Sequence, residues 1–175
     1  MKIASKISLL LLTVITTFSC GELDELTEFD ITQDFDTTIN VDITDDSEGQ
    51  PQSWSQSSTI NLADNEQVQA NLDLVQDVNI NSLTFTIINF VGVENTMATE
   101  VSLSFGETVI SLEDLDLQDN TTIYSLGTSS ELNTIANDLK DTSEITATIN
   151  GTVTSTPVKF DVVITLDVTT TFDII

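Results

Sequence analysis

Residues 157–175 read PVKFDVVITLDVTTTFDII and alternate between apolar and polar side chains. From Val158 to Ile174 the even positions carry Val, Phe, Ile or Leu, with one Thr, whereas the odd positions are mostly Asp, Thr and Lys. Successive side chains of a strand point to opposite faces, so this pattern predicts a strand with one buried face and one solvated face. Because the buried face must be covered by a second layer, the pattern also predicts two packed sheets.

The same two-residue period recurs along most of the chain. It predicts strands over residues 35–43, 59–63, 79–91, 101–105, 108–112 and 144–155. Gly106-Glu107 predicts a hairpin turn, and Thr156-Pro157 predicts a turn that joins the last two strands into a terminal hairpin. Asn150-Gly151 is a competing turn signal, but the alternation continues through it, which favours a bulge there.

Two segments follow a helical period instead. Apolar residues at Val68, Leu72 and Val75 predict a short helix within residues 64–77. A helix over residues 128–140 is predicted by its apolar stripe and by the capping box that Thr128 and Glu131 form. Residues 44–58 are predicted to be a polar loop whose Trp54 covers the core. The predicted fold is therefore mainly β: an antiparallel β-sandwich, immunoglobulin-like in outline, with two short helices.

The N-terminus has the organisation of an export signal. Lys2 and Lys6 precede an apolar run over residues 7–18, which is too short to span a bilayer and ends at Ser19-Cys20. Cys20 is the only cysteine of the chain. These residues resemble a bacterial lipoprotein signal, although Thr17 and Phe18 depart from the strict pattern. The resemblance implies that Cys20 is lipidated and becomes the first residue of the mature protein, anchored to a membrane through its acyl chains.

Three regions follow from this interpretation: a signal peptide over residues 1–19, an acidic tether over 20–33 and a β-sandwich domain over 34–175. Gly21 follows the cysteine, and for a lipoprotein of a two-membrane bacterium this implies transport to the outer membrane. The protein is thus expected in the cell envelope, either exposed on the cell surface or facing the periplasm.

Composition excludes several chemistries. The chain has 29 acidic residues against four lysines, and it contains neither His nor Arg. Nucleic acid would be repelled by this charge. Without His or a free thiol, the usual Ser-His-Asp, Cys-His and zinc sites cannot be built. We therefore expect no enzymatic activity and no cofactor, with calcium as the one open alternative.

Calcium is considered because carboxylates crowd two predicted loops and this ion prefers oxygen ligands. The candidate ligands are Asp42, Asp45, Asp46 and Glu48 in the first loop, and Glu113, Asp114, Asp116 and Asp119 in the second. A solvated acidic surface explains the same residues. The sequence thus predicts a lipid-anchored, non-catalytic binding or structural domain whose protein or glycan ligand is unknown. Two alternatives are a calcium-dependent adhesion or glycan-binding module and a periplasmic accessory subunit of an envelope complex.

Overall fold

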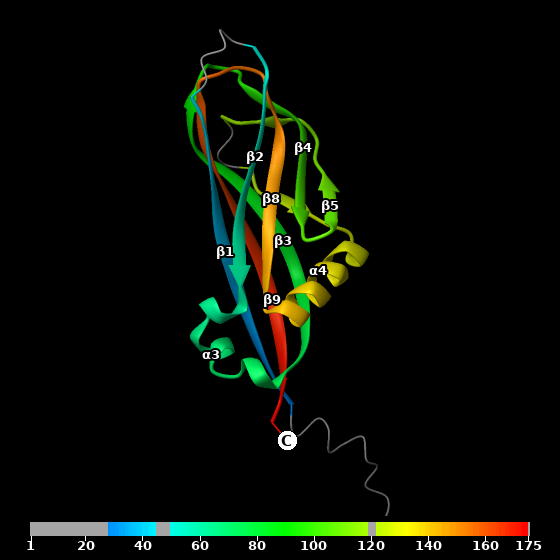
Figure 1. Cartoon of the computed structure of the whole chain (residues 1–175). Coiled ribbons are helices and arrows are strands. Elements are labelled where there is room, and N and C mark those ends of the chain that lie inside the picture. Colours follow the sequence, from blue (N-terminus) through cyan, green and yellow to red (C-terminus); the bar gives the residue numbers. More distant parts are fainter. Residues whose placement is uncertain (1–27, 45–49, 119–121, 175) are drawn as a thin grey trace, which may run out of the picture.

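The computed structural model describes residues 28–44, 50–118 and 122–174. Cys20, most of the predicted tether, Asp45, Asp46, Glu48 and Asp119 lie outside these residues. Two antiparallel sheets pack face to face, which confirms the predicted mainly β sandwich with short helices (Figure 1). None of the helices in the described residues has the length and apolar character needed to cross a bilayer.

The first sheet is built around the C-terminal strand. Its order is β1-β9-β3-β7, with bounds Glu28–Ile43 for β1, Val158–Asp173 for β9, Val75–Gly92 for β3 and Tyr124–Leu126 for β7. Every even position of β9 from Val158 to Phe172 is buried, as the alternation predicts, whereas Ile174 is 58% exposed. Since a fully buried aliphatic side chain contributes about 1.5–3 kcal/mol, this face is a major source of stability.

The second sheet covers that buried face. Its order is β2-β8-β4-β5, and the two-residue β6 pairs with the far end of β4. The bounds are Gln52–Asn61 for β2, Glu144–Val153 for β8, Met97–Phe105 for β4, Thr108–Ser111 for β5 and Leu115–Asp116 for β6. The predicted hairpin at Gly106 is confirmed: Phe105 pairs with Thr108, and Gly106 has a φ of 55°. Glycine tolerates this left-handed conformation best.

The predicted terminal hairpin is wrong, because β8 and β9 belong to different sheets. Both strands carry a full row of apolar side chains, and the two rows bury each other only when they face across the sandwich. Asn150-Gly151 is not a turn, and the bulge predicted there is not on β8, which passes through both residues in regular register with β2. The irregular register lies in the neighbouring strand β4, between Thr99 and Ser102, where Glu100 has a φ of 52°. A Cβ on Gly151 would lie 3.1 Å from a methyl group of Val101, so glycine permits this close approach.

Two predictions about the first two strands need correction. β1 begins at Glu28, so residues 28–33, which we assigned to the tether, pair with β9. The predicted loop over residues 44–58 contains most of β2, whose exposed serines hide the strand pattern. Trp54 nevertheless contributes to the core as expected: it is 8% exposed, and its ring meets Phe160 edge to face at 5.5 Å.

The first predicted helix is broken into short pieces. A 3₁₀ turn spans Leu62–Asp64, α3 spans Glu66–Gln69, and a second 3₁₀ turn spans Leu72–Leu74 before β3 begins at Val75. Asn65, and not Asp64, caps α3, because its Oδ1 accepts hydrogen bonds from the backbone N–H groups of Gln67 and Val68. The second predicted helix is confirmed as α4 (Ser129–Thr142), with the capping box of Thr128 and Glu131 in place.

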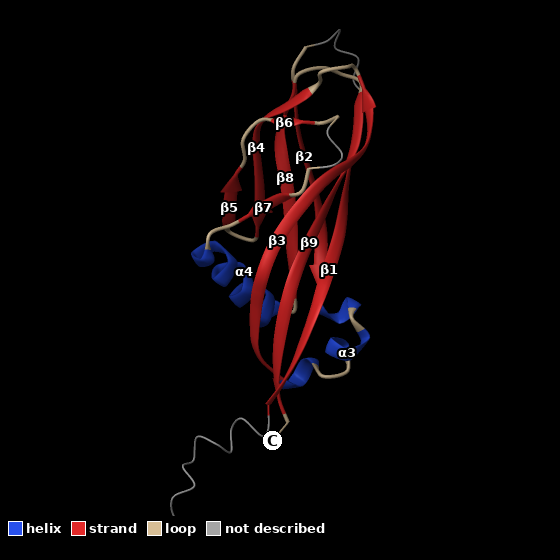
Figure 2. Ribbon diagram, turned by 180° about the vertical axis from the view of Figure 1, so that it is seen from behind, coloured by secondary structure: helices blue, strands red, loops and turns tan. Residues whose placement is uncertain are grey.

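Both ends of the described chain lie at the same end of the sandwich, because Glu28 pairs with Asp173. The helices α3 and α4 lie toward this end on opposite sides of the molecule (Figures 1 and 2). There α4 packs against β3 and β8, so it bridges the two sheets where the second sheet ends. The opposite end carries the β3–β4 and β8–β9 connections.

Candidate functional site

A cleft of about 450 Å³ opens between the two sheets at the edge formed by β7 on one side and by β5, β6 and their connection on the other. Ten residues line it, of which six are aliphatic or aromatic and four are polar or charged: Phe85, Ser111, Leu112, Glu113, Asp114, Leu115, Ile123, Tyr124, Ser125 and Leu126. This volume lies within the usual range for ligand-binding pockets. We therefore treat this edge cleft as the candidate site.

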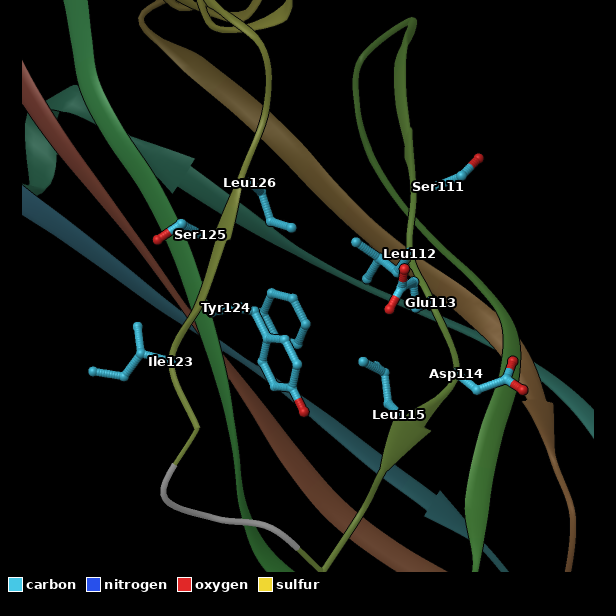
Figure 3. A pocket seen from close by; sticks show the side chains of 10 residues that line it. Ser111, Leu112, Glu113, Asp114, Leu115, Ile123, Tyr124, Ser125 and Leu126 are labelled. Carbon is cyan, nitrogen blue, oxygen red and sulfur yellow. The ribbon is translucent and has the colours of Figure 1, made fainter.

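One bank of the edge cleft is the short strand β7. Tyr124 and Leu126 point across the cleft, whereas Ile123 and Ser125 point away from it (Figure 3). The Tyr124 ring stacks on Phe85 of β3, with ring centroids 4.6 Å apart and planes inclined by 10°. Phe85 is only 2% exposed, and Tyr124, which is half-buried, covers it. The two stacked rings therefore form the aromatic floor of the cleft.

The other bank is the segment from the end of β5 to β6. Leu112 is held by a backbone hydrogen bond from its N–H to the carbonyl of Val101, at 2.9 Å, and Leu115 is buried beside it. Glu113 and Asp114 are exposed. The Glu113 carboxylate lies on the side that faces Tyr124, whereas Asp114 points away from it (Figure 3). The lining contains two carboxylates and no basic side chain. The cleft therefore offers an apolar interior with a negatively charged rim.

Of the acidic residues that the sequence groups as calcium ligands, the structure describes Asp42, Glu113, Asp114 and Asp116. Asp42 lies on β1 and forms an ion pair with Lys159, with Nζ and Oδ2 3.5 Å apart. Asp116 lies on β6, where its Oδ1 accepts a hydrogen bond from the N–H of Gln118 at 2.9 Å. Glu113 and Asp114 belong to the cleft rim. Over residues 28–44, 50–118 and 122–174, no three acidic, thiol or imidazole side chains converge in a way that could hold a metal ion.

Other carboxylates are bound into the outer face of the first sheet. Asp161 accepts hydrogen bonds from the side-chain amides of Asn40 at 2.6 Å and Asn89 at 2.8 Å, one on each neighbouring strand. The hydrogen bond from Asn89 has the largest effect on the pKa of Asp161 and lowers it, and the bond from Asn40 has the next largest effect in the same direction. The charge of Lys159 lowers this pKa by a smaller amount. Asp36 and Asp30 accept similar bonds from Thr165 and Thr171. This face is a structural ladder of polar side chains between strands.

Sequence analysis did not identify the edge cleft. It assigned residues 108–112 to a strand and treated Glu113 and Asp114 only as an acidic cluster. Tyr124 is the single tyrosine of the chain, and Ile123 beside it is 71% exposed. An aromatic and an aliphatic residue side by side, in a stretch with no clear period, could have indicated an accessible apolar surface. A strand of three residues is, however, too short for its alternation to be recognised in the sequence.

No protein-family model matches the chain, and no curated protein matches it. Among solved structures, the chain is similar to the BFDV capsid protein, solved as a decamer, with a TM-score of 0.43 and 10% identity over 82% of this chain and 98% of that one. A chain of desmodium yellow mottle tymovirus aligns with a TM-score of 0.36 and 8% identity over 84% of both chains. A chain of tobacco necrosis virus aligns with a TM-score of 0.29 and 14% identity over 79% of this chain and 95% of that one. The strand pairing itself shows that the fold is a sandwich of two antiparallel sheets.

Proposed function

We propose that this protein is a lipid-anchored, non-catalytic binding protein of the bacterial cell envelope, held at the outer membrane through Cys20, and that the edge cleft is its ligand site. The observation that carries the binding role is the stacked pair of Phe85 and Tyr124 at the floor of an open cleft that has both apolar and polar lining residues. Apolar surface that stays accessible to water is stabilised when a ligand covers it.

The arrangement of the strand ends supports the anchor. The chain enters the sandwich at Glu28, next to the C-terminal end of β9, so an acylated Cys20 would hold this end toward the membrane. Eight residues span at most roughly 30 Å, so the tether would keep the domain close to the bilayer. The strands that line the edge cleft, β5, β6 and β7, lie on the side of the sandwich and not at the end where Glu28 pairs with Asp173 (Figure 2). This position would leave the cleft accessible to a ligand.

Composition supports the non-catalytic role. The chain has no His, and its one thiol is the residue proposed to be acylated. The polar lining residues are Glu113, Asp114, Ser111, Tyr124 and Ser125, of which Ser125 points away from the cleft. This set can orient a ligand and attract a cation, but it lacks the base that would activate a serine as a nucleophile.

The anchor is tested by expressing the full chain and its Cys20→Ala variant in a two-membrane bacterium. The wild-type protein should sediment with outer membranes and incorporate labelled fatty acid, whereas the variant should be soluble and unlabelled with an unchanged melting temperature. Equal membrane association of both proteins would refute the anchor.

The binding role is tested with the neutral fluorophore Nile red on the mature chain, residues 20–175, which contains every described element. We expect saturable binding of one molecule, lost in Leu112→Asp and kept in Val109→Asp. Val109 is the matched control because it is 58% exposed, lies on β5 and does not line the cleft. Binding that survives in Leu112→Asp would show that the cleft is not the site.

A further inference from the structure

We propose that the ligand of the edge cleft is an extended peptide segment of a partner protein, which adds as a strand beside β7 and carries Arg or Lys at every second position. This inference rests on the proposed function, since it uses the same cleft. It adds a mode of binding, a chemical class of ligand and a register.

The position of β7 provides the first step. Within the described part of the chain, β7 has a neighbouring strand on one side only: it pairs with β3, with Leu126 opposite Leu83 and Tyr124 opposite Phe85. The last strand of a sheet is a template for another extended chain, and peptide-binding domains use such edges. An added strand beside β7 would lie along the mouth of the edge cleft.

The alternation of β7 fixes where the peptide side chains go. Tyr124 and Leu126 point into the cleft, and Ser125 between them points away (Figure 3). Directly opposite residues of paired strands share a face, so every second side chain of the peptide would enter the cleft beside these two. The other side chains would lie on the outer face of the sheet, next to the exposed Ser125 and Ile123.

The chemistry of the cleft selects the inward side chains. They would first cross the apolar surface of Tyr124 and Leu112 and then reach the Glu113 carboxylate at the rim, with Asp114 beside it in sequence. Arg and Lys match this sequence of environments, because their alkyl stems pack on apolar surface while their charged ends stay at its margin. The Tyr124 ring adds a favourable contact for a guanidinium group. Acidic and neutral segments lack this complementarity.

The chain has a formal net charge of −25 and will attract any basic peptide. The test must therefore distinguish binding of Arg side chains in the edge cleft from general attraction by the negative charge. We suggest calorimetric titration of the mature chain with an eight-residue Thr-Arg alternating peptide and with an Arg-Arg-Thr-Thr repeat of the same length and composition. The alternating peptide should bind at least about tenfold more tightly, because only in its sequence are two side chains that enter the cleft beside Tyr124 and Leu126 both Arg. Equal affinity for the two peptides would overturn the inference.

Charge reversal provides the matched protein variants. Glu113→Lys combined with Asp114→Lys should weaken binding of the alternating peptide about tenfold or more, and should create binding of a Thr-Glu alternating peptide. The control combines Glu94→Lys with Glu107→Lys, which changes the net charge equally at exposed positions outside the cleft. Equal weakening in both double variants would mean that only the overall charge matters.

Backbone pairing is tested by N-methylation of the alternating peptide, either on every Arg amide or on every Thr amide. In a strand these two sets of N–H groups face opposite edges. One methylated peptide should therefore lose binding and the other should keep it, whereas similar binding by both would exclude strand addition. If Nile red binds the cleft but the alternating peptide does not, the inference fails and the proposed function stands; if neither binds there, both fail.

Discussion

The two lateral edges of the sandwich differ in how they meet water. At the edge formed by β1 and β2, the strands contact each other, and Thr37 and Ser58 join the sheets through a hydrogen bond of 2.6 Å between their hydroxyl oxygens. At the edge formed by β5, β6 and β7, the strands are two to four residues long and the sheets part around the cleft. One edge is closed by polar pairing, and the other leaves aromatic and aliphatic side chains accessible. One edge of the core therefore contributes stability, and the other is the edge that we propose for binding.

The largest effect is expected at Ile164, which lies between the two edges. It is fully buried on β9, opposite Thr37 on one side and Phe85 on the other. Ile164→Asp should lower the free energy of unfolding by several kcal/mol, enough to unfold a domain of typical stability, because it buries an unpaired charge. Circular dichroism during thermal unfolding measures this effect.

The matched change at the open edge is Leu112→Asp. Its side chain is half-buried at the cleft, so the carboxylate can turn toward water, and the loss should be at most about 1–2 kcal/mol. Equal destabilisation by Ile164→Asp and Leu112→Asp would contradict the distinction between a closed core and an open cleft.

An effect of similar size is expected at the closed edge. Ser58→Ala leaves the buried hydroxyl of Thr37 without the partner it has in the structure, which should destabilise the protein by about 1–3 kcal/mol. Adding Thr37→Val, which replaces the hydroxyl with a methyl group of similar shape, should restore most of this loss. Denaturant unfolding of the two single variants and the double variant gives the coupling energy. Additive losses would show that the hydrogen bond does not close this edge.

The next effect concerns the helix that follows β7. Thr128 caps α4: its hydroxyl oxygen accepts from the N–H of Glu131 at 3.4 Å, and its own N–H donates to the Glu131 carboxylate at 2.6 Å. Thr128→Ala should cost about 1 kcal/mol in urea unfolding, whereas Thr128→Ser should cost little because serine caps equally well. If the two variants are equally destabilised, the cap is not the cause.

A still smaller effect depends on pH. Because the hydrogen bonds from Asn89 and Asn40 lower the pKa of Asp161 in the folded state, its carboxylate stabilises the fold at neutral pH, and this contribution is lost as the pH falls below about 4. Asp161→Asn should therefore be less stable than wild type at pH 7, by less than about 1 kcal/mol, with a smaller difference at pH 3. With Asn40→Ala and Asn89→Ala also present, Asp161→Asn should have the same effect at both pH values. A difference that grows on acidification would contradict this sign.

The smallest effect is expected from calcium. Asp42 is paired with Lys159, and Glu113, Asp114 and Asp116 do not converge within the described residues. Millimolar calcium should therefore raise the melting temperature no more than magnesium does, since a ligand stabilises a fold only by binding to it. A calcium-specific increase would restore the calcium-dependent module as the better interpretation.

The regular strands and the long helix could be predicted from local pattern. The burial of β9, the hairpin at Gly106 and the capping box of α4 each depend on residues that are close in sequence. β2 was missed because edge strands tolerate polar side chains, as its exposed Ser53, Ser55 and Ser57 show. The first helix was predicted too long because the spacing of Val68, Leu72 and Val75 is helical, although Val75 already belongs to β3.

By itself, the sequence determined the class of fold, the inward faces of β1, β8 and β9, the lack of imidazole chemistry and the position of the proposed anchor. These properties follow from composition and from the two-residue period, which are local. Only the tertiary structure decided that β8 and β9 face each other across the sandwich, and that Phe85, Leu112 and Tyr124 surround one cleft. Strand partners are selected by burying whole apolar faces against one another, and no spacing along the chain records that choice.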